Sequence, residues 1–265
     1  MNKTVKKLLV AGACVAGAMY VTNYLMDKKT YRLKKEERAE RGQIYRFRHG
    51  DVFFVKKGEG SPILLIHDIS PELSHKDWDD SINEFTEGHT VYALDLLGCG
   101  RSDKPKLIYS NYMYVELITS FIKDVIGEKT TVIATGTSCS AALMAANMDK
   151  DIISKLMFIN PAPLLELAES PNKVKDKALL VFGLPIIGEF IYNMFYLRSD
   201  DEEFLEAHRG RNLGRFLLMS MLGRYTNINI THALKKAVVP IVLLGDKNEA
   251  ERYKSFNENI ELVNW

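Results

Sequence analysis

The sequence has little cysteine, little tryptophan and almost no net charge. Its 265 residues include 3 Cys and 2 Trp, and 35 Lys and Arg residues offset 34 Asp and Glu residues, which leaves a formal charge of +1. Three cysteines, an odd number, exclude a small domain held together by disulfides. Cys14, Cys99 and Cys139 also lack the close spacing of metal ligands. The charge balance gives no electrostatic case for nucleic acid. We therefore expect no metal, no cofactor and no nucleic-acid partner.

One long apolar run is present, at the amino terminus. Residues 8–26 (LLVAGACVAGAMYVTNYLM) lie between basic segments, and this is about the length of helix that crosses the roughly 30 Å core of a bilayer. We predict a retained single-span membrane anchor through residues 8–26, with a charged linker up to residue 42. The alternatives are a cleaved signal peptide, a lipoprotein signal at Cys14, or a buried helix of a soluble protein.

Basic residues around this run bear on its orientation. Three lysines precede it, whereas seven Lys and Arg residues follow it between positions 28 and 41. The excess of positive charge after the span favours a main domain on the cytoplasmic side. A short basic amino terminus argues for the opposite side, so the orientation stays open.

From residue 43 onward, short apolar runs alternate with helical patterns. A hairpin is expected around residues 49–51, buried strands at 62–66, 90–94, 131–134, 156–159, 241–244 and 260–263, and helices at 76–85, 112–125 and 139–148. This alternation predicts an α/β fold, a mostly parallel, doubly wound sheet with helices on both faces. The alternation stops within residues 163–232, where an inserted helical cap is expected. We predict two units, an anchor and linker (1–42) and the α/β domain (43–265).

Within the cap, residues 178–197 (ALLVFGLPIIGEFIYNMFYL) are almost long enough to span a bilayer. Pro185, Glu189 and Asn193 argue against a span. We expect this stretch to pack over the sheet and to line an apolar pocket. The alternative is that it dips into the membrane to collect a lipid-like substrate.

A short motif follows the third buried strand. Gly136-Thr137-Ser138-Cys139-Ser140 has the small-x-Ser-x-small layout of a nucleophile elbow. In such a turn the serine stands clear of the sheet, and the helix that follows offers its N–H groups and dipole to a developing oxyanion.

Three further stretches support a family resemblance. They are Leu64-Leu65-Ile66-His67-Asp68, the segment DLLGCGRSDKP at residues 95–105, and PIVLLGD at residues 240–246. With the elbow, they make residues 43–265 similar to the α/β-hydrolase superfamily. The resemblance implies an eight-stranded, mostly parallel sheet, a cap domain and a Ser-acid-His triad.

The resemblance also assigns candidate site residues. It makes Ser138 the nucleophile and the N–H of Cys139 one oxyanion donor, with a second donor at Asp68 or Ile69. The family usually has glycine at position 68, and a carboxylate beside an oxyanion is electrostatically unhelpful. The position of the acid falls on Asn248, with Asp246 or Glu249 as substitutes.

The resemblance leaves the base of the triad unassigned. The family's histidine follows the last strand, and residues 260–265 (IELVNW) contain none. We therefore expect a membrane-anchored serine esterase or lipase-like enzyme for a small apolar acyl ester, with its histidine absent from this chain. The alternatives are a non-catalytic member of the superfamily that binds a ligand or partner, or an enzyme truncated at its carboxyl end.

Overall fold

The computed structural model describes residues 2–37, 42–169, 176–196 and 214–263. Its strands are β1 (Gln43–Phe47), β2 (Gly50–Lys57), β3 (Ser61–Ile66), β4 (His89–Leu94), β5 (Thr130–Gly136), β6 (Ile153–Pro161), β7 (Ile241–Leu244) and β8 (Glu261–Val263). Its α-helices are α1 (Lys3–Glu37), α2 (Asn111–Phe121), α3 (Ser138–Met148), α4 (Leu164–Leu167), α5 (Asp176–Gly183), α6 (Ile187–Tyr196), α8 (Arg215–Leu222), α9 (Thr231–Lys236) and α10 (Lys247–Phe256). Short 3-10 turns cover His75–Trp78 and Glu84–Thr86, and a π-helical turn (Ile122–Ile126) extends α2.

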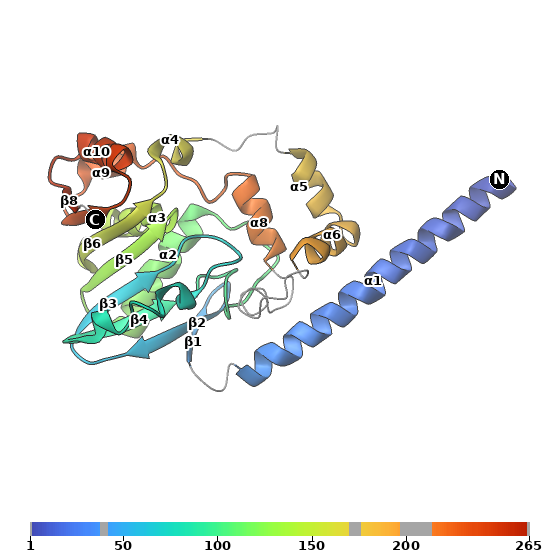
Figure 1. Cartoon of the computed structure of the whole chain (residues 1–265), viewed down its shortest axis with the longest axis horizontal. Helices are drawn as coiled ribbons and strands as arrows, with labels where there is room; N and C mark the ends of the chain where they lie inside the picture. Colours follow the sequence, from blue (N-terminus) through green and yellow to red (C-terminus); the bar gives the residue numbers. More distant parts are fainter. Residues whose placement is uncertain (1, 38–41, 170–175, 197–213, 264–265) are drawn as a thin grey trace.

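The strands form one eight-stranded sheet in the order β1-β2-β4-β3-β5-β6-β7-β8 (Figure 1). β2 pairs antiparallel with β1 and β4, and every other pair is parallel. The expected α/β architecture with a mostly parallel sheet is therefore confirmed. In this order β4, β3 and β5 are neighbours, so their carboxyl ends meet at one edge of the sheet.

Strand β3 shows why the parallel strands read as continuous apolar runs. Leu64 and Ile66 pack into the larger core, with α2 and α3, while Ile63 and Leu65 pack into a second cluster on the other face, with Trp78. All four aliphatic side chains are buried. A strand covered on both faces has no polar side to alternate with.

The expected helix over residues 76–85 is wrong. The segment begins as a helical turn at Ser74, which accepts a hydrogen bond from the Lys76 N–H and forms a capping box with Asp77. It continues only as 3-10 turns, with Trp78 and Ile82 buried below it. Aspartate, serine and asparagine side chains compete with a helix for backbone hydrogen bonds, and residues 79–83 include four side chains of these types. The hydroxyl of Ser81 donates to the carbonyl of Trp78 at 3.4 Å.

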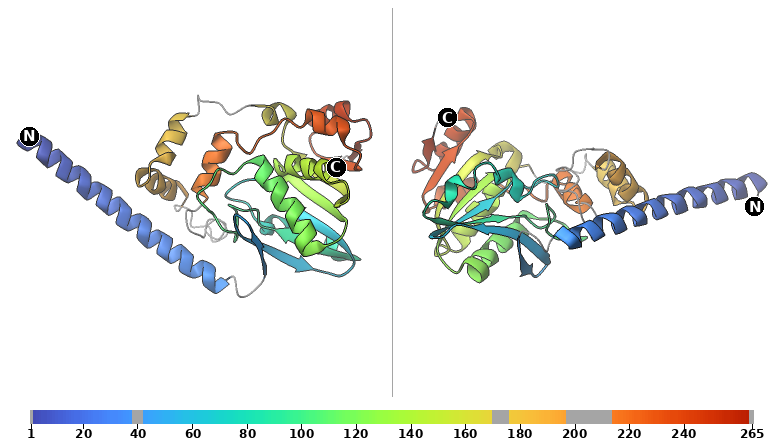
Figure 2. Two further views of the ribbon diagram at one scale, coloured as in Figure 1. Left: turned by 180° about the vertical axis from the view of Figure 1, so that it is seen from behind. Right: turned by 60° about the horizontal axis from the view of Figure 1, so that its bottom comes forward.

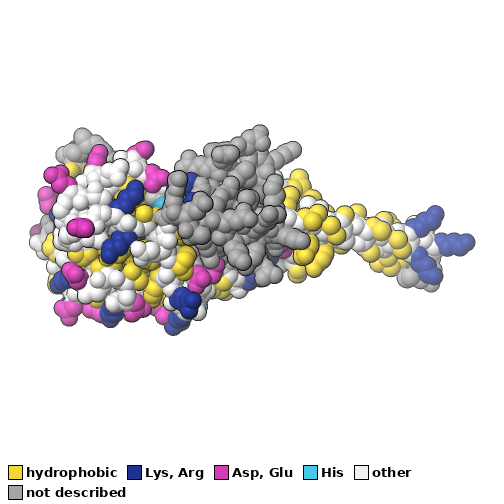
Figure 3. All heavy atoms as spheres, turned by 90° about the horizontal axis from the view of Figure 1, so that it is seen from below, with side chains coloured by type: hydrophobic (Ala, Val, Ile, Leu, Met, Phe, Trp, Pro, Cys, Tyr) yellow, Lys and Arg dark blue, Asp and Glu magenta, His cyan; other side chains and the backbone are white. Residues whose placement is uncertain are grey.

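Helix α1 (Lys3–Glu37) extends beyond both ends of the apolar run at residues 8–26 from which a helix was predicted. It continues without a break through the charged residues to Glu37 and extends past the α/β domain (Figure 2). Residues 3–26 are long and apolar enough to cross a membrane: an 18-residue window within them has a mean hydropathy of 1.6, and few of its residues are buried. Figure 3 shows the apolar surface of this helix, with lysines at its free end.

The inserted segment is helical in its described part. The stretch from residue 178 divides into α5 and α6, with a turn at residues 184–186 that contains Pro185. These two short helices lie between α1 and α8 (Figure 1). The cap boundaries at 163 and 232 stay predictions.

Candidate functional site

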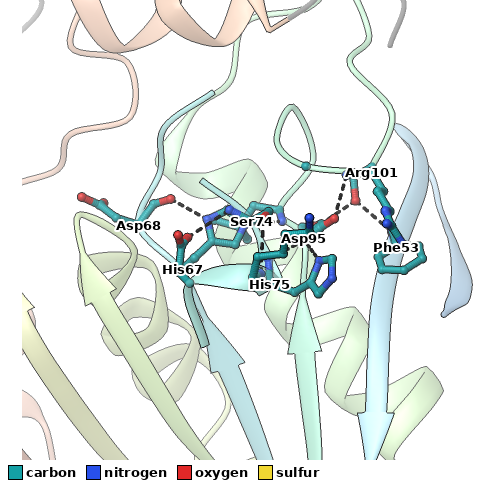
Figure 4. A network of polar contacts seen from close by, with 12 residues as sticks. Phe53, His67, Asp68, Ser74, His75, Asp95 and Arg101 are labelled. Carbon is teal, nitrogen blue, oxygen red and sulfur yellow. Dashed lines mark hydrogen bonds and ion pairs between the residues drawn. The ribbon is translucent and has the colours of Figure 1, made fainter. Parts of the chain in front are cut away.

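The carboxyl ends of β3, β4 and β5 bring together the residues of the candidate site. His67 and Asp68 follow β3, Asp95 follows β4, and Gly136 ends β5. Ligands of open α/β sheets bind at this edge, because the loops leave the strands there and helix amino termini point toward it. Figure 4 shows the polar network formed by the loops after β3 and β4.

The turn from β5 into α3 has its left-handed residue at Gly136. Gly136 has a φ of +56°, whereas Thr137 has φ −66° and ψ −27° and Ser138 is already the first residue of α3. In a nucleophile elbow the strained residue between strand and helix carries the nucleophile. By this criterion the apex of the turn is Gly136, which has no side chain.

Ser138 lies two residues beyond that apex. Its side chain is buried, with 1% of the residue exposed, and its hydroxyl donates a hydrogen bond of 2.7 Å to the carbonyl of Thr135. We expected Ser138 to stand at the apex, and the structure instead places it inside the first turn of the helix. The pentapeptides ATGTS (residues 134–138) and GTSCS (residues 136–140) both have small residues at their first and fifth positions. The spacing of small residues alone therefore did not determine whether Gly136 or Ser138 is the central residue of the elbow.

Asp68 fills the space above the apex. Its Oδ1 accepts hydrogen bonds from the N–H groups of Ile69 at 2.7 Å and Thr137 at 2.6 Å. A Cβ added at Gly136 would overlap the Asp68 carboxyl group. One carboxylate oxygen therefore bridges the loop after β3 and the turn after β5.

The two N–H groups occupy the positions that bind an oxyanion in this kind of elbow. One belongs to the residue after the apex and the other to the loop after β3. The N–H of Ile69 donates to Asp68, which contributes its carboxylate oxygen to this contact, and the role of Ile69 as an oxyanion donor stays a prediction. Cys139 lies further along α3, with its thiol buried against the carbonyl of Ala134. Burial raises the pKa of that thiol well above its ordinary value.

The protonation of Asp68 reflects two opposing effects. Burial raises the pKa of this carboxyl, and the N–H groups of Thr137 and Ile69 act to lower it. Burial is the larger effect, so the pKa lies above its ordinary value. The hydrogen bonds therefore offset only part of the unfavourable free energy of transferring this carboxylate from water to the protein interior.

His67 supports the loop that carries Asp68. The N–H of Leu96 donates to Nε2 of His67 at 3.0 Å, and Nδ1 lies 2.7 Å from the carbonyl oxygen of Asp68. Because Nε2 accepts, the proton of the neutral ring lies on Nδ1 and is donated to that carbonyl. Burial lowers the pKa of His67, which favours this neutral form. The ring thus links the loops after β3 and β4.

Asp95 holds the adjacent loop in place (Figure 4). Its Oδ1 accepts from the N–H of His75 at 2.6 Å and lies 2.7 Å from the Nδ1 of the same residue, while Oδ2 accepts from the N–H of Arg101 at 2.7 Å. Burial acts to raise the pKa of Asp95, but the side-chain hydrogen bond with His75 and the N–H of Arg101 act to lower it and outweigh burial. The pKa therefore lies below its ordinary value, and the carboxylate is charged at neutral pH.

The three candidates for the acid all lie at the start of α10. Asp246 and Glu249 accept hydrogen bonds from backbone N–H groups. Asp246 caps α10 by accepting from the N–H of Glu249 at 3.0 Å. Glu249 in turn accepts from the N–H of Leu164 at 2.7 Å. Asn248 is exposed on α10. Among the described hydrogen bonds, none joins these residues to Ser138, so their assignment as the acid stays a prediction.

Two cavities lie away from the elbow. One of about 660 Å³ lies between α2, α3 and α9 and is lined by Met144 and His232 among others. A second, of about 470 Å³, lies beside His75 and Arg101. Neither is lined by Gly136 or Asp68. Within the described ranges, no group of three or more His, Cys, Asp or Glu residues has the arrangement of a metal site.

Comparison with known proteins defines the class to which this fold belongs. Residues 63–261 match the alpha/beta hydrolase family, so the chain belongs to that family.

A 137-residue part of the chain is 28% identical to an uncharacterised protein of Mycobacterium tuberculosis, covering 49% of this chain and 39% of that protein. A 134-residue part is 22% identical to the 2-hydroxy-6-oxo-6-(2'-aminophenyl)hexa-2,4-dienoic acid hydrolase of Metapseudomonas resinovorans, covering 49% and 46%. The matched part is thus less than half of each relative. The solved thioesterase domain of the curacin biosynthetic pathway superimposes with a TM-score of 0.65 at 18% identity, covering 84% of this chain and 92% of that one. This likeness shows the fold.

Replacing Asp95 by Asn tests the loop network. The amide nitrogen would face a backbone N–H that the carboxylate now accepts, and the buried charge opposite His75 would be lost. We expect the free energy of unfolding to fall by about 3 kcal/mol, measured by urea denaturation. Because the pKa of Asp95 is lowered on folding, its stabilisation is present above the unfolded-state pKa and is lost as the pH falls through the folded value. The exposed Asp80→Asn is the control, and equal effects of the two variants would contradict the network.

Asp68→Asn tests the buried charge at the elbow. The amide oxygen can accept the same two N–H groups without a charge, so we expect this variant to be more stable than the wild type at about pH 7.5. A raised pKa means that the folded wild type binds its proton more tightly than the unfolded chain. The wild type therefore gains stability relative to the variant as the pH falls through the folded pKa. A stability difference that is independent of pH would show that Asp68 does not titrate differently on folding.

A double-mutant cycle tests the overlap of residues 68 and 136. Gly136→Ser should destabilise the protein both by backbone strain and by collision with Asp68. Asp68→Gly removes the collision, so the two changes together should cost about 1–3 kcal/mol less than their sum. Gly127→Ser is the matched control, because Gly127 has a φ of +74° with open space around it. Asp68→Gly should not rescue that variant, and strict additivity at position 136 would contradict the overlap.

Proposed function

We propose that this chain is a membrane-anchored member of the alpha/beta hydrolase family that binds a ligand or partner without serine-dependent hydrolysis. The observation that carries the proposal is the Asp68 carboxylate on the N–H groups of Ile69 and Thr137, above a glycine at the apex of the elbow.

Two chemical arguments support this proposal. Covalent acyl transfer needs a nucleophile at the apex, and Gly136 supplies none. The reaction also needs N–H donors aimed at the developing oxyanion, and those donors are already hydrogen-bonded to Asp68. An oxyanion approaching them would meet a carboxylate in the same place, and like charges repel strongly where water is excluded.

A second candidate function is a serine esterase or lipase-like hydrolase of a small apolar ester, with Ser138 as nucleophile. Membership of the family supports it, and so do the hydrolase and thioesterase names of the proteins to which the chain is similar. This function would require the β5–α3 turn to rearrange. Ser138 would have to leave its hydrogen bond with Thr135 and become exposed, and Asp68 would have to release the two N–H groups.

The membrane anchor is part of the same proposal. Helix α1 is apolar from residue 8 to residue 26, most of its side chains there are exposed, and basic residues flank the run in the sequence. An exposed apolar helix of this length is unfavourable in water and favourable in a bilayer. The excess of Lys and Arg after the run favours a cytoplasmic domain. A signal sequence is the other function that fits such a helix.

Labelling with a fluorophosphonate probe distinguishes the two candidate functions, because the probe reacts with activated serines. We expect the folded wild type and Ser138→Ala to show the same background labelling, less than about 1% of that of an active serine esterase measured alongside. Heat-denatured protein supplies the blank. Strong labelling of the wild type that disappears in Ser138→Ala would overturn the non-catalytic proposal in favour of the esterase.

A further inference from the structure

Helix α1 contacts the cap through a pair of buried asparagines. Nδ2 of Asn193 on α6 donates to Oδ1 of Asn23 at 3.1 Å, and Nδ2 of Asn23 donates to the carbonyl of Ile186 at 3.2 Å. Asn23 is 5% exposed and Asn193 is 1% exposed. Two side-chain amides are thus paired in the middle of an apolar contact between segments far apart in the sequence.

The contact covers one face of α1. Ala16, Met19, Thr22 and Met26 are partly buried there, at the three- and four-residue spacing of a helical face, together with the buried Asn23. At 1.5 Å per residue, the ten steps from residue 16 to residue 26 extend about 15 Å along the helix. The cap therefore lies beside the half of the apolar run that is nearer to the α/β domain (Figure 1).

The hairpin of α5 and α6 is itself apolar on its free surface. Its exposed large apolar side chains are Leu180, Val181, Leu184, Ile187 and Met194. Between residues 179 and 194 the sequence has a single charged residue, Glu189. A surface of this kind next to an apolar helix is typical of a membrane contact.

The hairpin is also joined to the α/β domain. The guanidinium of Arg215, at the start of α8, donates to the carbonyl of Leu184 at 3.3 Å and is almost fully buried. Two residues further along, Leu217 is buried in the main core. The position of the hairpin is therefore tied both to α1 and to the sheet.

We propose that the α5–α6 hairpin inserts into the same lipid leaflet as the second half of the apolar run of α1. This inference rests on the proposed anchor. If residues 8–26 cross the bilayer, residues 16–26 lie in the leaflet nearer to the α/β domain, and a hairpin packed beside them shares their depth. Helices of 8 and 10 residues, about 12 and 15 Å long, are too short to span but reach into one leaflet.

A location within the lipid leaflet also explains why Asn23 and Asn193 are paired. In lipid, a polar side chain without a partner is unfavourable, and paired amides between helices stabilise their association. The occupant of the apolar surface is therefore a phospholipid bilayer. The cap would then present a lipid-facing side to apolar molecules dissolved in that leaflet.

Quenching of tryptophan fluorescence by brominated acyl chains tests this proposal on the full chain in phosphatidylcholine vesicles. Three variants each add one tryptophan to the native background, which the wild type supplies for subtraction. Leu184→Trp reports on the hairpin, Val10→Trp on the anchor, and Val238→Trp on an exposed position of the α/β domain between α9 and β7. We expect brominated lipid to lower the added fluorescence about twofold or more at positions 184 and 10, and to leave position 238 unchanged.

The possible results separate the inference from the anchor on which it rests. Quenching at position 10 but not at 184 would keep the anchor and overturn the insertion of the hairpin. Quenching at 184 but not at 10 would overturn the anchor and keep the lipid contact of the cap. A tryptophan at 184 that is shielded from aqueous iodide yet not quenched by brominated lipid would show that protein covers this surface instead of lipid, and would overturn the proposal.

Discussion

The bridge from the Asp68 carboxylate to the N–H groups of Ile69 and Thr137 is the interaction on which the edge of the sheet depends. It connects the loop after β3 to the turn after β5, and it lies where a side chain at position 136 would otherwise be. The left-handed turn, the glycine at its apex and the two occupied N–H groups are therefore one arrangement. The carboxylate at position 68 excludes a larger residue at position 136 and occupies both backbone donors.

The loops around this bridge hold one another in place. The ring of His67, in the loop after β3, accepts a hydrogen bond from the N–H of Leu96 in the loop after β4. The carboxylate of Asp95 accepts from the N–H groups of both His75 and Arg101 and so joins their segments. The hydroxyl of Ser102 donates to the carbonyl of Asp95 and accepts from the N–H of Phe53 on β2. Buried backbone groups in loops need such partners, and here side chains from neighbouring loops supply them. The result is an edge, built from β2, β4, β3 and β5, whose loops are joined by side-chain hydrogen bonds.

The sheet could be predicted from the sequence because its signal is local. Continuous apolar runs such as residues 62–66 are explained by burial on both faces, and the glycine-rich segment at 95–105 identifies the family. The site was harder to predict because it depends on register. A shift of two residues exchanges Ser138 for Gly136 at the apex, and both versions have small residues at both flanks.

Other parts depend on contacts between distant segments. Asn23 lowered the apolar character of its run, and nothing near it in the sequence indicated Asn193 as its partner. Trp78 and Ile82, from the turns between residues 75 and 86, pack in one cluster with residues of β3, β4 and β5, a contact that the local sequence did not indicate. The sequence showed only that Asp68 places a negative charge where the family usually has glycine. It did not show that this carboxylate accepts two backbone hydrogen bonds, because one donor lies in a turn about seventy positions away.

The overlap of residues 68 and 136 also restricts how such a chain can change over generations. A serine arising at position 136 while Asp68 is present meets an occupied space, so that route passes through a damaged protein. If Asp68 is replaced first, the collision does not occur, but the N–H groups of Ile69 and Thr137 lose the oxygen that accepts their hydrogen bonds. The order in which these two positions change therefore matters, because a side chain at position 136 fits only after the Asp68 carboxyl group has been lost.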